Sequence, residues 1–166
     1  MNGRKRGARG RWVMLVLAVA LAVGACAEAP EPSPEQQALF AQPVDAELVV
    51  PAARNAMRYE VGTITAPAGA TVRLVMDNSA TTSPAMIHNV VVVATKSDIE
   101  RVGRAAASER DNIPDDPAIL TYTPLAGPGE RTAVVFTMPP PGEYPFLCTY
   151  PGHFAFMQGT LVSVAP

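Results

Sequence analysis

The chain has 166 residues, of which 48% are hydrophobic and 17% charged, so it has room for one domain with a buried core. Its formal charge of −2 hides an uneven distribution. Five of the 13 basic residues lie in the first 11 positions, whereas the chain from Cys26 onward carries 8 basic and 15 acidic residues. An acidic chain without a concentrated basic patch does not favour nucleic-acid binding. Two Cys and two His exclude a disulfide framework and any metal cluster larger than one small site.

Residues 1–25 have the layout of an export signal. The basic start is followed by uncharged residues from Trp12 to Ala27, fewer than the roughly 18–20 that a membrane-spanning helix needs. The run ends in Val-Gly-Ala-Cys26, which resembles a bacterial lipobox, where cleavage precedes the Cys and a lipid is attached to its thiol. We therefore expect a lipoprotein-type signal peptide and lipidation of Cys26, with ordinary secretory cleavage or an uncut anchor as alternatives. All three place the protein outside the cytoplasm, in the periplasm or on the outer face of a bacterial membrane.

Residues 26–45 are expected to be a Pro/Glu-rich linker. Residues 28–44 alone hold four Pro and three Glu. Because Pro disfavours helix and sheet pairing and like charges repel, the segment is expected to be extended. At about 3 Å per residue it would hold a domain up to roughly 50 Å from a membrane. A disordered stub without a role as a tether is the alternative.

Residues 46–166 have the pattern of an all-β domain. Apolar and polar residues alternate with a period near two, and turn sequences such as Pro67-Ala68-Gly69 separate the segments. The segment 89–93 is β-branched and is expected to be buried on both faces. The expected strands are 59–65, 72–76, 89–93, 133–137, 142–148 and 158–164.

One helix is expected to interrupt the strands. Ser97 and Glu100 fit a capping box, with apolar residues on one face until about Glu109. About seven short strands with one short inserted helix predict a β-sandwich of Greek-key type.

The residues able to bind a metal fall in two segments. His88 precedes the valine-rich strand, whereas Cys148, His153 and Met157 share one loop. Two sulfur and two imidazole ligands suit copper, while Met is a poor ligand for zinc. Two His and one Cys with a weak axial Met form the electron-transfer type of copper site. The four side chains are therefore expected to bind one copper ion that cycles between Cu(I) and Cu(II).

The sequence Cys148-Thr-Tyr-Pro-Gly-His153, with Met157 four positions further on, resembles the copper loop of azurins and auracyanins in the cupredoxin family. The segment around His88, residues 126–131 and residues 157–161 are also azurin-like, and the resemblance covers roughly 46–164. It implies a type 1 blue copper domain in which His88, Cys148 and His153 are strong equatorial ligands and Met157 is axial.

The resemblance also implies roles for residues around the ligands. The Asn89 amide would donate to the Cys148 sulfur, and its side chain would brace the loop at Thr149. The carbonyl of Ile87 would make a weak contact with the metal, although azurins have Gly at this position.

Electrons would leave through the His153 ring, which lies in an apolar surface patch in the family. The candidates for this docking surface are Pro84, Ala85, Met86, Pro151, Phe154 and Phe156. A small apolar surface suits brief docking, and the acidic charge would steer a basic partner. Redox proteins such as c-type cytochromes or membrane respiratory or photosynthetic complexes are the expected partners of a monomer.

Two other classes of function compete with electron transfer. A copper carrier or store is the alternative reading of the same ligands. An enzyme is not expected, because a hydrolase would need a further base and oxyanion site, and a catalytic copper would need additional His. Neither a nucleic acid nor a small-molecule substrate is expected.

Overall fold

The computed structural model describes Asn2 and residues 31–166. Two β-sheets pack face to face, one of three strands in the order β1-β3-β6 and one of five in the order β2-β8-β7-β4-β5. The predicted all-β sandwich is confirmed. The strands are β1 (Ala46–Pro51), β2 (Thr63–Pro67), β3 (Thr71–Asp77), β4 (Val91–Val93), β5 (Ile119–Tyr122), β6 (Arg131–Thr137), β7 (Gly142–Leu147) and β8 (Gln158–Val164).

Both parallel strand pairs join strands that are not consecutive in the sequence. β1 runs parallel to β3, β2 runs parallel to β8, and the remaining pairs are antiparallel. The strand expected from residue 59 begins only at Thr63, and Tyr59 instead forms an isolated bridge with Ala52. Packing within the five-stranded sheet is tight at Gly159 in β8, where an added Cβ would lie 2.1 Å from the ring of Phe146, its paired neighbour in β7.

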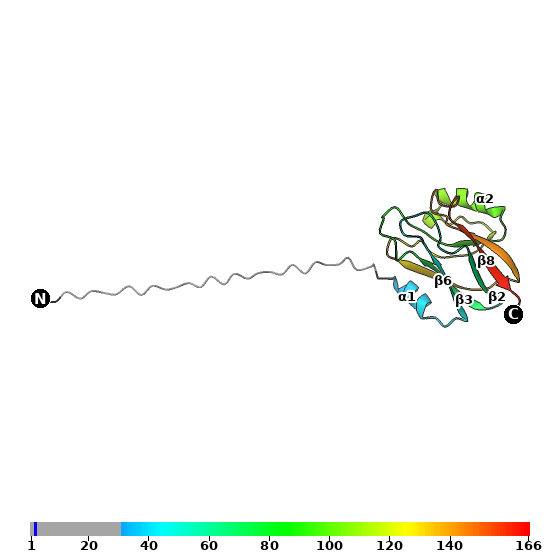
Figure 1. Cartoon of the computed structure of the whole chain (residues 1–166), viewed down its shortest axis with the longest axis horizontal. Coiled ribbons are helices and arrows are strands. Elements are labelled where there is room, and N and C mark those ends of the chain that lie inside the picture. Colours follow the sequence, from blue (N-terminus) through cyan, green and yellow to red (C-terminus); the bar gives the residue numbers. More distant parts are fainter. Residues whose placement is uncertain (1, 3–30) are drawn as a thin grey trace.

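Strand β4 is buried on both faces, as its valines predicted. Val92 and the preceding Val90 belong to the main core between the sheets, whereas Val91 and Val93 belong to a second apolar cluster on the outer face. That cluster is covered by Val102 of the inserted helix α2 (Asp98–Ala105). Helix α2, at the top of the domain in Figure 1, therefore completes the burial of the strand that follows His88.

The predicted capping box of α2 is wrong. Ser97 has helical backbone angles and makes no side-chain cap bond. The first turn is held instead by the Asp98 carboxylate, which accepts from the backbone N–H and the hydroxyl of Thr95 at 3.1 and 2.7 Å. The α-helix also ends at Ala105, and the chain continues as short 3-10 turns at Ala106–Ser108 and Arg110–Asn112.

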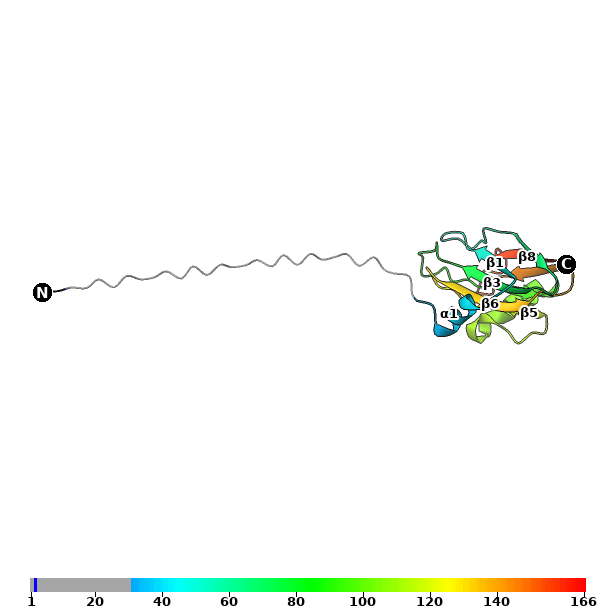
Figure 2. The same ribbon diagram turned by 90° about the horizontal axis from the view of Figure 1, so that it is seen from below.

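The segment expected to be an extended linker contains a second helix, α1 (Pro34–Ala41). The Gln36 side chain is buried and forms two hydrogen bonds with the backbone of Ala133 in edge strand β6, at 3.2 and 2.6 Å. Arg73 of β3 donates to the carbonyl of Leu39 at 2.9 Å and to that of Gln42. Both views show α1 beside β6 (Figures 1 and 2).

No helix among residues 31–166 has the length and apolar character required to cross a membrane. The predicted signal peptide and Cys26 lie outside the described residues.

Candidate metal centre

Three of the predicted ligands meet inside the sandwich although 60 residues separate His88 from Cys148. The Nδ1 atoms of His88 and His153 lie 3.9 and 3.7 Å from the Cys148 Sγ and 3.2 Å from each other. His88 and Cys148 are fully buried, and His153 retains 4% of its surface. The structure thus brings one thiol and two imidazoles to a single point.

The three atoms leave a space that suits a metal ion. The point equidistant from them lies about 2.1 Å from each, within the range of about 2.0–2.3 Å for nitrogen and sulfur bonds to zinc, a similar first-row metal. No other group of three or more His, Cys, Asp or Glu side chains with this arrangement occurs in the described part of the chain. The donor set and its spacing therefore fit one metal ion.

His88 is held by a short backbone bridge rather than by a long strand. It exchanges two backbone hydrogen bonds with Ala126, at 3.1 and 2.7 Å. The buried amide of Asn78 donates to the carbonyls of Met86 and Ala126 at 2.9 and 3.0 Å. These bonds fix the segment before β4, from which the His88 side chain reaches the centre.

The other candidates share the loop between β7 and β8. Gly152 adopts a φ of +86°, which favours glycine, and the His153 amide donates to the Tyr150 carbonyl at 3.0 Å. The Met157 amide donates to the His153 carbonyl at 2.9 Å, and the Met157 carbonyl accepts from the Cys148 amide at 3.1 Å. Two tight turns thus fold the loop back on itself, and Met157, four residues after His153, is fully buried.

Asn89 joins the His88 segment to this loop. Its side chain donates to the Thr149 hydroxyl at 2.8 Å and accepts from the Thr149 amide at 2.9 Å. Backbone hydrogen bonding from Asn89 and Tyr150 opposes the rise that burial causes in the pKa of the Cys148 thiol. The two segments are therefore joined by direct hydrogen bonds as well as by the metal ligands. The predicted metal contact of the half-buried Ile87 remains a prediction.

Burial sets the protonation of the metal-free site. It raises the pKa of Cys148 to about 11, against the opposing effect of the two backbone hydrogen bonds. Burial and then the neighbouring His153 lower the pKa of His88 to about 4, and burial lowers the pKa of His153. At neutral pH both imidazoles are uncharged and ready to bind a metal, while the thiol must lose its proton when the metal enters.

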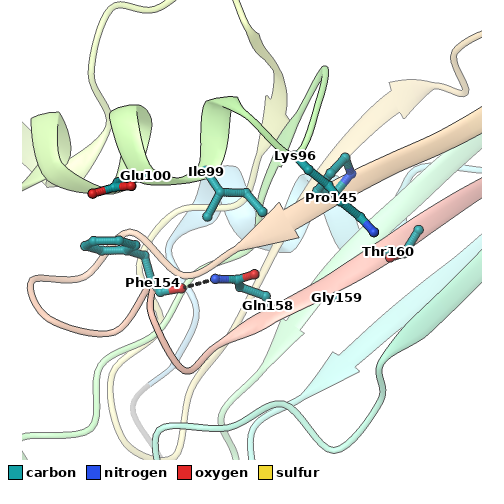
Figure 3. A pocket seen from close by; sticks show the side chains of 8 residues that line it. All are labelled: Lys96, Ile99, Glu100, Pro145, Phe154, Gln158, Gly159 and Thr160. Atoms are coloured by element: carbon teal, nitrogen blue, oxygen red, sulfur yellow. Dashed lines mark hydrogen bonds between the residues drawn. The ribbon is translucent and has the colours of Figure 1, made fainter.

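The predicted docking residues fall into two groups. Phe156 is 67% exposed, and Pro84, Ala85 and Pro151 are also exposed, while Met86 is half-buried. Phe154 instead packs against α2, where a Cβ on Gly103 would lie 2.4 Å from its ring. It lines a surface pocket beside α2 together with Gln158, which donates to its carbonyl at 2.8 Å (Figure 3). The contacts of Phe154 are thus those of a packing residue.

Sequence reasoning missed two polar residues next to the centre, Tyr59 and Thr123. Tyr59 is buried and donates to the Asn89 carbonyl at 2.5 Å, and the Thr123 hydroxyl accepts from the Val90 amide at 3.0 Å. Both partners are at least 30 residues away along the chain. Neither contact has a local sequence signal.

The fold and the donor set define a β-sandwich protein with a buried, mononuclear two-His, one-Cys metal centre. The family model described as copper binding proteins, plastocyanin/azurin family, matches residues 46–164. The chain belongs to this family, and copper is the cofactor for which its centre is built.

Two curated relatives come from Chloroflexus aurantiacus. Auracyanin-B is 36% identical over 118 residues, which cover 68% of this chain and 49% of auracyanin-B. Auracyanin-A is 33% identical over 111 residues, covering 64% of this chain and 67% of auracyanin-A. The match thus spans about half to two thirds of the length of these relatives.

Solved structures of auracyanins share the fold. A structure of auracyanin B superposes with a TM-score of 0.67 at 33% identity, covering 75% of this chain and 92% of that chain. A structure of auracyanin A, described as a blue copper protein from the same bacterium, gives a TM-score of 0.65 at 28% identity, covering 70% and 97%.

Proposed function

We propose that this protein carries single electrons between redox partners through one type 1 copper ion. The observation that carries the proposal is the buried triangle of two imidazole nitrogens and one thiol sulfur. Copper supplies a one-electron Cu(I)/Cu(II) couple in such a site. The protein's contribution is to hold the ligands in place, so that little has to move when the charge changes.

Each ligand has a distinct part in this proposal. His88, Cys148 and His153 bind the metal strongly, and Met157 is the weak axial ligand. Asn89 and Thr149 hold the two ligand segments together through the hydrogen bonds between them. Such outer partners orient the ligands and tune the metal.

The exit for the electron is proposed at His153. His153 is the only one of the four proposed ligands with any exposed surface, since the other three residues are fully buried. Exposed Pro151 and Phe156 on the same loop, with Met86 before His88, would form the docking surface. We propose c-type cytochromes or membrane respiratory or photosynthetic complexes as partners, docking to a monomer.

Electron and copper transfer can be separated in one experiment. The copper-loaded chain is expected to show an intense visible band and a reversible one-electron wave, and to oxidise a reduced c-type cytochrome while keeping its copper. The measurements are visible and EPR spectra, potentiometry and copper analysis after mixing with an apo copper acceptor. Rapid loss of copper to the acceptor without electron exchange would favour the copper carrier instead.

We propose no enzymatic step, because both His of the chain are already used in the one centre.

We further propose that the copper domain is exported and tethered. The proposed division is a signal peptide over 1–25, a linker over 26–45 and the copper domain over 46–166, and the family match beginning at residue 46 supports the last boundary. Within this linker, α1 is docked on the domain, so only the part before Pro34 would act as a free tether. The basic start, the short apolar run and the lipobox-like end at Cys26 support a lipid anchor on the outer face of a bacterial membrane.

The change Cys26→Ser is expected to move the protein from the membrane fraction to the soluble fraction of exporting cells. The reason is that the substitution removes the only proposed attachment point while leaving every metal ligand in place. The measurement is immunoblotting of separated fractions, with Ser33→Ala in the same region as a matched control that keeps the thiol. Retention of the Cys26→Ser chain in membranes would contradict lipidation.

A further inference from the structure

We propose that Tyr59 is a positioning residue for the copper centre, acting through the backbone of Asn89. Tyr59 lies outside the ligand segments, in the chain before β2, and its side chain is buried in the main core. The inference rests on the proposed copper function and deepens it.

The Tyr59 hydroxyl forms one hydrogen bond, to a backbone carbonyl. It donates to the Asn89 oxygen at 2.5 Å, and its ring packs edge to face on Phe146 with centroids 5.4 Å apart. Burial, and then the nearby Cys148, raise the pKa of Tyr59 well above its usual value, so the group stays a protonated donor. The packed ring leaves the hydroxyl little freedom to choose another partner.

The peptide unit between Asn89 and Val90 is held by a side-chain hydrogen bond at each of its two polar groups. Its carbonyl accepts from Tyr59, and its N–H donates to the fully buried Thr123 hydroxyl at 3.0 Å. The Thr123 amide also donates to the Val90 carbonyl at 2.9 Å. The orientation of this peptide is therefore fixed by two side chains that contact no proposed ligand in the hydrogen-bond network.

The fixed peptide controls a hydrogen bond to the metal-binding sulfur. The Asn89 side chain is bonded to the hydroxyl and the amide of Thr149, the residue after Cys148, at 2.8 and 2.9 Å. The Asn89 N–H shares its Cα with the peptide unit that Tyr59 and Thr123 hold, and it is the donor to Cys148 Sγ in this proposal. A donor at the sulfur withdraws electron density from the thiolate, which favours Cu(I) over Cu(II). Loosening the peptide would weaken this donor and shift the balance toward Cu(II).

Two substitutions test the two hydrogen bonds that hold this peptide unit. Tyr59→Phe keeps the ring, and Thr123→Val keeps the shape, while each removes one hydroxyl. In the copper-loaded full chain each is expected to raise the Cu(II)/Cu(I) ratio at a fixed potential about threefold, less than the ten- to hundredfold effects of direct outer partners on metal binding. The visible band should shift, and the two effects should not add.

Tyr144→Phe is the matched control, because the Tyr144 hydroxyl donates to the Pro140 carbonyl at 2.9 Å, away from the centre. It is expected to retain the wild-type potential and band. Unchanged potential and band in Thr123→Val, or in Tyr59→Phe, would overturn the positioning role even if stability fell. If Tyr59→Phe does not fold, Thr123→Val decides. A wild-type chain without a band or redox wave would overturn the copper function itself, and this inference with it.

Discussion

The change Cys148→Ser is expected to abolish the intense visible absorption of the copper-loaded protein. That absorption arises from charge transfer between sulfur and copper, and among residues 31–166 Cys148 supplies the only thiol near the two imidazoles. A hydroxyl is a harder and weaker donor for copper. We therefore also expect copper affinity to fall by more than about 100-fold, because loss of even an outer partner costs about 10–100-fold. The measurements are a visible spectrum and a competitive copper titration.

A matched control distinguishes the proposed ligand Cys148 from the other cysteine of the chain. In the full chain, Cys26→Ser removes the other cysteine and is expected to keep the band. The metal-free Cys148→Ser domain should remain folded by circular dichroism, because Ser has nearly the same volume. A persistent intense band in Cys148→Ser would show that the sulfur ligand is elsewhere and that the proposed site is wrong.

The change Met157→Leu is expected to raise the reduction potential while the blue colour is largely kept. Leu fills the same buried space without the thioether, so Cu(II) loses a weak donor that Cu(I) needs less. A tenfold loss of preference for Cu(II) corresponds to about 59 mV in a one-electron couple, and we expect a rise of about this size. Potentiometric titration of the loaded protein measures the shift.

Met138→Leu is the matched control for this change. Met138 is also buried in the main core, but its backbone bonds to Gly69 and Ala70 in the turn between β2 and β3. Its replacement is expected to leave the potential unchanged within experimental error. A fall in potential for Met157→Leu would contradict the axial assignment, and an equal rise in both variants would point to a general packing effect.

Much of the fold was predictable because strands have a short sequence period. The alternation around Val72–Met76 and the run of valines in β4 reflect burial on one or both faces, and burial is local information. The metal cluster was predictable for a different reason. The chain has so few Cys and His that their spacing alone left one possible site.

The helix α1 could not be predicted by counting prolines. Pro34 occupies the first turn of the helix, where its missing N–H is not needed, and the Ser33 hydroxyl accepts from the Gln36 amide at 3.3 Å. Ser33-Pro34 with Gln36 was therefore an available start signal. The docking of Gln36 on Ala133, 97 residues away, has no local signal, nor does the Tyr59 bond to Asn89.

The docking of α1 changes the volume that a tethered copper domain would search. With Cys26 as the lipid anchor, the free tether between the anchor and the domain would end near Ser33, just before α1, instead of at Ala46, where β1 begins. Seven residues span at most about 25 Å, against about 70 Å for twenty. Confinement of this kind raises the effective concentration of the domain near a partner in the same membrane, by about tenfold as an order of magnitude. In a lipid-anchored protein, the hydrogen bonds between Gln36 and β6 would thus favour nearby partners over distant ones.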